Sequence, residues 1–355
     1  MVCRGIPIKA CENCRTAYKK AGNIGSACFV ENLSIHDPNF PSKSSYRAFM
    51  LHTMTGHLCM PSAWGTHVYG ALALLKLQTT HVDSPLFRSM YFFVQKNVIC
   101  QPVDEIFTQG LPSSCHDPEI RLFSIAAGIP RLQHQSIDLT QLRANDIERI
   151  FYDANELDFL LSNWTKGLPN AWSYATALNI NSDACSEYSP QSVHRYAHFY
   201  TARVWNFYRV SQLILLSIQL RASSILPASS DTSQIRKRMA TLVDDICATV
   251  PYLLGKDLCK MNHQFVTSHR TLYISLLTSG STVKKVENVQ NGRFSLVWPL
   301  YVACSASEVP QVQRNWIRKQ LQYLAQGGVP IAKTVCNTES QILLGRPEVF
   351  HFGCV

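Results

Sequence analysis

Charged side chains are scarce in this sequence. Asp, Glu, Lys and Arg together make up 16% of the 355 residues, against roughly 25% in ordinary soluble domains. Much of the chain is therefore expected to lie in an interior or beneath a partner. The formal charge is +9, but the longest basic runs are only Lys19–Lys20, Arg236–Arg238 and Lys284–Lys285. Nucleic-acid and targeting patches have longer runs, so we interpret these three as solvated faces.

Long apolar runs are also missing. The most membrane-like stretch, Val210–Leu220, is shorter than a membrane span and contains two serines and two glutamines. The first ten residues hold no apolar run of the kind found in a signal peptide. We therefore expect no membrane span and a reducing compartment, in which most of the thirteen cysteines are buried thiols.

The familiar signatures of catalysis are absent from the sequence. It has no dinucleotide-binding or phosphate-binding glycine loop, no nucleophile elbow and no H-E-x-x-H metal motif. His194 and His198 have the spacing of a metal pair at the start of a predicted helix, but no carboxylate follows at a matching interval. Asp244 and Asp245 are adjacent, so on a helix they point about 100° apart. We expect no catalytic residue, no metal and no cofactor.

The start of the chain holds one cysteine pair of the kind that binds zinc, without a second pair at a matching spacing. Cys11 and Cys14 form a C-x2-C pair, and the nearest other thiols are Cys3 and Cys28. These spacings match no zinc ribbon or finger, and a short helix with Cys14 facing inward explains the pair equally well. Residues 1–40 are therefore expected to be a poorly defined segment without a complete zinc cluster.

The densest helical pattern lies in Tyr196–Ala222. Apolar side chains recur there at steps of three and four residues, and further apolar side chains occupy the other faces. The pattern predicts an α-helix of about seven turns. Because it is apolar nearly all round, we expect neighbours to cover it on several sides.

Other stripes with the same period predict further helices. The clearest run from Asn145 to a stop at Gly167, from Ile235 to Pro251, and from Val309 to Gly327, and shorter ones cover 46–57, 61–75, 86–99 and 120–129. In the first of these, Asp158 and the other acidic residues are expected to face water.

The intervening segments 131–139, 172–190 and 284–293 are predicted to be polar linkers and loops. No stretch sustains the period of two that indicates a strand, and no fixed repeat length is present. The predicted fold class is all-α, a large irregular multi-helix domain that is not a regular solenoid.

Four segments in this order resemble a known family: CMPSAWGTHVYGALALLKLQ (59–78), RYAHFYTARVWNFYRVSQLILLSIQLRA (195–222), LVDDICATVPYLLG (242–255) and VWPLYVACSASEVPQVQRNWIRKQLQYLAQGGVPIA (297–332). They are similar to the regulatory domain, or middle homology region, of fungal Zn(II)2Cys6 transcription factors, in particular the branch common in secondary-metabolite gene clusters. The resemblance implies an all-helical regulatory domain at 41–335, a C-terminal tail at 336–355, and a nuclear protein of transcription regulation.

The chain departs from the family in its zinc-binding module. Six cysteines hold two zinc ions in that module, whereas here Cys11, Cys14 and Arg15 match its opening, the third cysteine is absent, and no second C-x2-C follows. Zinc and direct DNA binding are therefore not carried over from the resemblance. Without the cluster, the recognition element that contacts phosphates and bases is missing.

Three functional hypotheses follow. The first is a regulator of a secondary-metabolite gene cluster, whose partners are other transcription factors or coactivators and a small-molecule effector. The second is an enzyme or ligand-binding protein of secondary-metabolite biosynthesis recruited from the same fold. The third is that upstream exons of the gene encode the missing zinc cluster.

An effector pocket, if the chain has one, is expected where the family-like segments meet. The candidate residues are aromatic or imidazole side chains, which are also explained as plain core: Trp64, His67, Trp205, Tyr208, Trp298 and Trp316.

Overall fold

The computed structural model describes residues 117–179, 188–226, 232–256, 263–265 and 285–346. All of them belong to the compact unit that spans Val68–Val355. The helices predicted at 46–57, 61–75 and 86–99 and the Cys11–Cys14 pair lie outside the described residues.

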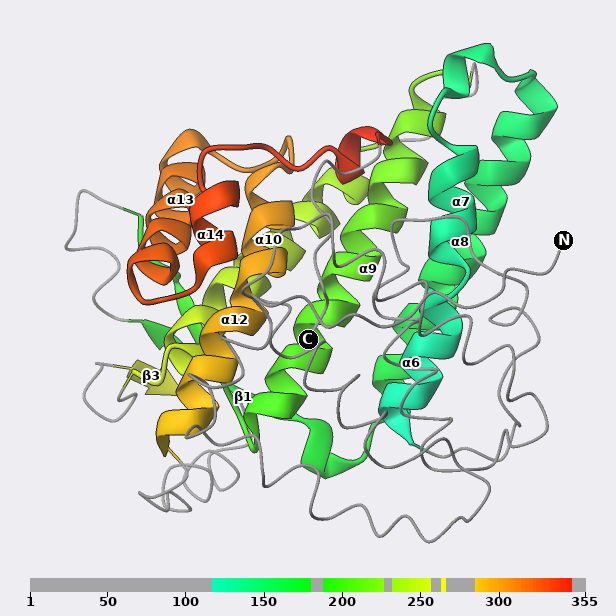
Figure 1. Ribbon diagram of the computed structural model, residues 1–355. Coiled ribbons are helices and arrows are strands. Elements are labelled where there is room, and N and C mark those ends of the chain that lie inside the picture. Colours follow the sequence, from blue (N-terminus) through cyan, green and yellow to red (C-terminus); the bar gives the residue numbers. More distant parts are fainter. Residues whose placement is uncertain (1–116, 180–187, 227–231, 257–262, 266–284, 347–355) are drawn as a thin grey trace, which may run out of the picture. The chain divides into compact units, whose positions relative to one another are not determined.

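The described part is mainly helical, which confirms the predicted fold class. Its α-helices are α6 (Pro118–Ala126), α7 (Ile129–Gln135), α8 (Ala144–Lys166), α9 (Phe199–Ser223), α10 (Ser233–Leu253), α12 (Lys285–Cys304), α13 (Gln311–Gln326) and α14 (Pro330–Val335) (Figure 1). Short 3-10 helices are η4 (Leu139–Gln141), η5 (Asn170–Trp172) and η8 (Ile342–Leu344). None of these described helices is long and apolar enough to cross a bilayer.

Helix α9 is the element on which the others pack. It contacts α8 on one side and α10 and α12 on the other, as Figure 1 shows, and it also contacts α6, α7, β2 and η8. Nearly every residue from Thr201 to Ser223 is buried. This confirms the prediction of a helix covered on several sides, because a helix that is apolar nearly all round can shed its water only by acquiring several neighbours.

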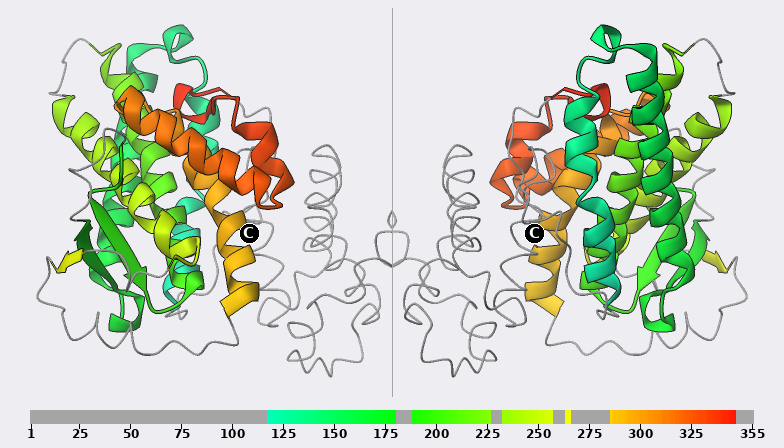
Figure 2. Two further views of the ribbon diagram at one scale, coloured as in Figure 1. Left: turned by 90° about the vertical axis from the view of Figure 1, so that its left-hand side faces the viewer. Right: turned by 90° about the vertical axis from the view of Figure 1, so that its right-hand side faces the viewer.

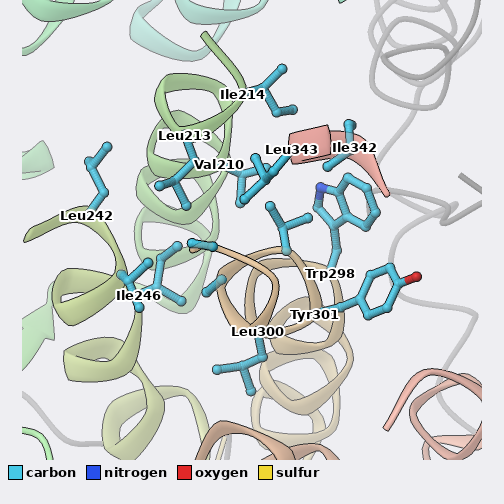
Figure 3. Close-up of a cluster of buried hydrophobic side chains, with 14 of the residues drawn as sticks. Val210, Leu213, Ile214, Leu242, Ile246, Trp298, Leu300, Tyr301, Ile342 and Leu343 are labelled. Atoms are coloured by element: carbon cyan, nitrogen blue, oxygen red, sulfur yellow. The ribbon is translucent and has the colours of Figure 1, made fainter. Parts of the chain in front are cut away.

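The apolar core lies between α9, α10, α12 and η8. Figure 3 shows the side chains that these elements contribute, and all of its labelled residues are at most 8% exposed: Val210, Leu213, Ile214, Leu242, Ile246, Trp298, Leu300, Tyr301, Ile342 and Leu343. Burying one such side chain contributes about 1.5–3 kcal/mol to stability. The cluster therefore fixes the relative positions of four elements from distant parts of the sequence.

A small antiparallel sheet is the main feature that the sequence did not predict. Strands β1 (Tyr174–Asn179), β2 (Ser192–Tyr196) and β3 (His263–Phe265) pair in the order β2-β1-β3. Figure 2 shows the sheet beside the helices. Tyr174 lies opposite Tyr196, and β2 contacts both α9 and α10. The prediction of a loop at 172–190 was wrong for β1, since a strand of six residues with small buried Ala175 and Ala177 gives almost no periodic signal.

Three helix boundaries also differ from the prediction. Helix α9 begins at Phe199, after the extended His198, so Tyr196 belongs to a strand. Residues 131–139 were predicted to be a linker, but Pro130 occupies the first turn of α7, where its missing N–H costs nothing. The polar segment 285–293 is the first part of α12.

The predicted helix ends agree better with the structure. Gly167 and Gly327 follow α8 and α13 directly, and α10 ends at Leu253, soon after Pro251. Val309 precedes α13, whose N-cap is Pro310. These ends were predictable because glycine and proline act through local backbone geometry alone.

Part of the segment predicted as a tail contributes to the core. Ile342 and Leu343 in η8 are 1% and 5% exposed and belong to the apolar cluster. The side-chain amide of Gln133 on α7 donates to the carbonyl of Ile342 at 2.6 Å, across 209 residues of sequence. Gly345 has φ +74°, and a Cβ there would collide with the guanidinium of Arg221 on α9. The core therefore extends beyond residue 335.

Candidate functional site

A buried arginine on α9 organises the most elaborate polar cluster of the described residues. Arg209 is 1% exposed. Its Nη1 donates to the hydroxyl of Tyr196 at 2.8 Å and to Oδ1 of Asn206 at 3.1 Å. The amide of Asn206 in turn donates to Oγ1 of Thr249 on α10 at 3.0 Å. A buried guanidinium requires such partners, because its desolvation is otherwise prohibitive.

Two ionisable side chains face the same guanidinium from other elements. His194 of β2 has Nδ1 at 3.3 Å from Nη2 of Arg209, and Asp245 of α10 has Oδ2 at 3.7 Å from its Nε. Because a guanidinium only donates, Nδ1 of His194 accepts. The proton of the neutral ring then lies on Nε2, which is 3.7 Å from Oδ1 of Asp245.

Aromatic rings complete the enclosure. The guanidinium carbon of Arg209 lies 5.2 Å from the ring centre of Tyr174 and 5.5 Å from that of Trp205, both within cation–π range. Tyr174 also packs against the rings of His194 and Tyr196, with centroid distances of 4.4 and 5.0 Å. The strands therefore supply two faces of the arginine site.

Burial sets the protonation states of this arginine cluster, by which we mean His194, Tyr196, Arg209 and Asp245. Burial, reinforced by the Arg209 charge, holds the pKa of His194 well below its usual value. Burial raises the pKa of Tyr196 and of Asp245, although Arg209 opposes both shifts. Burial alone would lower the pKa of Arg209, but the oxygens of Tyr196, Tyr174 and Asp245 outweigh it and raise the pKa.

The chemistry of the arginine cluster is that of a fixed cation beside neutral His194 and Tyr196 and one carboxylate, that of Asp245. The side chains of His194 and Arg209 are 3% and 1% exposed, whereas that of Asp245 is 31% exposed. Asp245 is therefore the member that solvent reaches. A reacting group must touch its substrate, so the geometry fits the fastening of β2 to α9 and α10 better than acid–base catalysis.

The two predictions about paired side chains have different outcomes. His194 and His198 do not share a helical face, since His194 lies in β2 and His198 is the residue before α9. Asp244 and Asp245 do point apart: Asp244 accepts from Gln313 at 2.8 Å, while Asp245 faces Arg209. Within the described ranges, no group of three His, Cys, Asp or Glu side chains has the arrangement of a metal site.

A second polar cluster joins α8, α9 and α10 at their rim. Arg238 donates to both carboxylate oxygens of Asp158, at 2.7 and 2.8 Å, and Gln212 donates to Asp158 at 3.1 Å. Asp158 is only 7% exposed. The prediction that Asp158 faces water was wrong. Arg236 and Arg238 are 52% and 42% exposed, which agrees with the interpretation of Arg236–Arg238 as a solvated run, although Arg236 also pairs with Glu308 at 2.8 Å.

The described residues of the predicted pocket lie on three different helices, each with its own aromatic neighbours. Trp205 and Tyr208 lie together on α9, with ring centres 5.5 Å apart and each within 5.5 Å of Trp164 on α8. Trp298 is on α12 beside Tyr301, and Trp316 is on α13 beside Tyr188.

Trp64 and His67 lie outside the described residues, so the shared pocket stays a prediction. Sequence reasoning missed Trp172 and Tyr174, which pack on the same aromatic group: Trp172 accepts a hydrogen bond from the Trp205 indole through its carbonyl at 2.8 Å.

Comparison with known proteins gives one informative similarity. No protein-family model matches the chain, and no solved structure matches it. Over 137 residues the chain is 31% identical to transcription factor dbaG of Emericella nidulans. The chain is similar to part of a fungal transcription factor.

The aligned stretch is 39% of this chain and 30% of that transcription factor, so the chain matches less than a third of the relative's length. The similarity supports the resemblance to fungal transcription factors. By itself the similarity shows neither a zinc cluster nor a middle homology region in this chain.

Proposed function

We propose that this chain is a nuclear regulator of a secondary-metabolite gene cluster that acts through contacts with other transcription factors or coactivators. The observation that carries the proposal is the 31% identity to a fungal transcription factor over 137 residues. The order of the family-like segments in the sequence agrees with it.

The geometry of the described part supports a role in binding rather than in chemistry. Its buried ionisable groups are fastened to one another, as in the Arg209 and Asp158 clusters. Because fold alone does not fix function, this support is secondary to the similarity. Direct DNA binding is not part of the proposal, because the C-x2-C pair of Cys11 and Cys14 lacks the other cysteines of the cluster.

A small effector is the second part of the proposal. The aromatic group of Trp164, Trp205 and Tyr208 lies against the buried Arg209 through Trp205. These three rings are at most 9% exposed, so a flat, apolar effector would reach their faces only by displacing the side chains that cover them. Changes at Trp205 or Tyr208 would then alter the response to a metabolite without abolishing partner binding.

Gene deletion with parallel transcript and metabolite profiling tests the function. Loss or gain of the transcripts of a biosynthetic gene cluster, restored by the wild-type gene, is the expected result. Unchanged transcripts with an accumulated intermediate would instead support the enzyme hypothesis. Two zinc ions per purified molecule, with saturable binding to promoter DNA, would overturn the exclusion of direct DNA binding.

A further inference from the structure

Helix α8 exposes two large aromatic side chains on its outer face. Tyr152 and Phe159 are 69% and 62% exposed, which makes them the most exposed large hydrophobic side chains in the described part of the chain. They are seven residues apart, so they lie on one face with a separation of about 10 Å along the axis. Leu160 beside them is 41% exposed. Exposed aromatic pairs at this spacing are typical of helices that insert into a groove.

The opposite face of α8 is held firmly in the core. Ile150, Ala154 and Leu161 are at most 4% exposed. The indole of Trp164 donates to the carbonyl of Pro118 at 2.7 Å, and Asp158 accepts hydrogen bonds from Arg238. A partner therefore meets a helix that is already ordered, which removes most of the entropic cost of immobilising it.

The charges on α8 indicate the charge of the surface that a partner would present to it. The helix carries five acidic and two basic side chains, although the chain as a whole has a formal charge of +9. Arg149 pairs with Asp146 at 3.2 Å, and Asp158 pairs with Arg238. Glu148 and Glu156 are exposed on the same face as Tyr152 and Phe159. This face disfavours phosphate backbones and favours a surface with basic residues.

We propose that the α8 face, formed by Glu148, Tyr152, Glu156 and Phe159, docks into an apolar groove on a protein partner, with lysine or arginine side chains along the groove's rim. The aromatic rings fill the groove, and the two glutamates pair with the rim. This inference rests on the proposed function, because it names the chemistry of the partner through which the regulator acts. Residues 1–116 of the chain itself and a second copy of the chain are the competing occupants that the test separates.

Site-specific photo-crosslinking in cells tests the docking. The full chain carries p-benzoylphenylalanine in place of Tyr152 or Phe159, with Val312 of α13 as the control position, because Val312 is 60% exposed on another helix. We expect positions 152 and 159 to crosslink to one and the same partner protein, and position 312 to give no such product. Peptide mapping then shows whether the crosslinked groove has an apolar floor and a basic rim.

Charge reversal makes the test specific. The double change Glu148→Lys with Glu156→Lys should reduce the crosslink at least about tenfold, as for loss of central interface contacts. Changing the mapped basic rim residues of the partner to glutamate should restore it. A crosslink to residues 1–116 or to a second copy, an equal yield from position 312, no crosslink, or insensitivity to charge reversal would each overturn the proposal.

Transcript measurements separate this inference from the proposed function. A Tyr152→Ala, Phe159→Ala variant should keep the thermal midpoint of the wild type, because both side chains are exposed, and should lose the transcript effect. If gene deletion alters the transcripts but this variant behaves as wild type, the α8 docking fails and the regulatory function stands. If deletion leaves the transcripts unchanged, the function itself fails.

Discussion

Two arginines on neighbouring helices are held in opposite ways. Arg209 on α9 is 1% exposed and is surrounded by neutral oxygens and nitrogens, ring faces and one carboxylate at 3.7 Å. The side chain of Arg238 on α10 is 42% exposed and makes a direct two-point ion pair with Asp158. The fully buried arginine thus has the weaker ion pair and the larger hydrogen-bonded enclosure.

The difference shows that the burial of a charged side chain decides how much its removal destabilises the protein. Removing a buried cation leaves several partners unsatisfied in a low-dielectric interior, where water cannot replace it. Removing a half-exposed cation costs less, because water reaches part of the space it leaves and screens what remains. Short ion-pair distances are therefore a poor guide to importance in this fold, and burial is the better one.

The largest effect is expected from Arg209→Ala. The change leaves the Tyr196 hydroxyl, Asn206 and Asp245 without their common partner, so the free energy of unfolding should fall by about 3–5 kcal/mol. Urea denaturation followed by far-ultraviolet circular dichroism measures the loss. Arg203→Ala on the same helix is the matched control and should cost far less. A loss below about 1 kcal/mol for Arg209→Ala would break the comparison.

Leu213→Ala tests the apolar core one turn further along α9. Leu213 is completely buried in the cluster of Figure 3, so the substitution should cost about 2–5 kcal/mol through lost transfer energy and the cavity that remains. The same denaturation measurement applies, with Leu160→Ala at an exposed position of α8 as control. Equal costs for Leu213→Ala and Leu160→Ala would contradict the placement of the core.

The pH dependence of stability tests whether His194 in the arginine cluster is held neutral. The pKa of His194 is depressed in the folded state, so the unfolded chain binds its proton more readily than the folded chain does. The stability contributed by neutral His194 is present above its unfolded pKa of about 6.5, and is lost at up to about 1.4 kcal/mol per pH unit as the pH falls below that value.

His194→Asn should remove this part of the slope, as unfolding curves between about pH 7.5 and pH 5.5 would show. His134→Asn, at an exposed ring of α7, is the control and should keep the slope that His194 causes. Asp245, whose pKa is raised by burial, contributes a slope of opposite sign from its unfolded pKa of about 4 upwards. Wild-type and His194→Asn slopes that coincide would show that His194 is not held neutral.

The smallest effect is expected from Arg238→Ala. Its guanidinium is half-exposed, and Gln212 still donates to Asp158 after the change. Because the carboxylate of Asp158 is nearly buried, the loss of stability should be about 1–3 kcal/mol, still below that of Arg209→Ala, and it should shrink at high salt. A loss as large as that of Arg209→Ala would invert the comparison between the two arginines.

The sequence predicts the helices well and their polar contacts poorly. Stripes with a period of 3.6 residues recover α8, α10 and α13, because each buries one continuous face, and α9, which is buried nearly all round. The short strands β1 and β2 escape detection, since they have only six and five residues; β1 buries small alanines, and β2 buries Val193, His194 and Tyr196. Apart from Asn206 on the same helix, the polar partners of Arg209 come from β2 and α10, so no local pattern could join them to it.

The burial of two charged side chains, Arg209 and Asp158, could have been predicted from the sequence. Arg209 stands in a helix that is apolar nearly all round, so it had no solvent-facing side to occupy, and a buried, partnered arginine follows from that. Asp158 lies four residues after Ala154 and three before Leu161, on the same face of α8 as both. The position of Asp158 on this face predicts that it is buried, although a negatively charged side chain usually faces solvent.

The hydrogen bond from Gln133 to the Ile342 carbonyl has a consequence for biosynthesis. It ties the second described helix to the last one, 209 residues later. On the ribosome, α7 and α9 emerge long before η8 can cover them, so the nascent chain carries uncovered apolar surface for the time needed to translate those residues. Contacts of such long range also slow the final closure. Chaperone supply during translation is therefore expected to affect the yield of this protein.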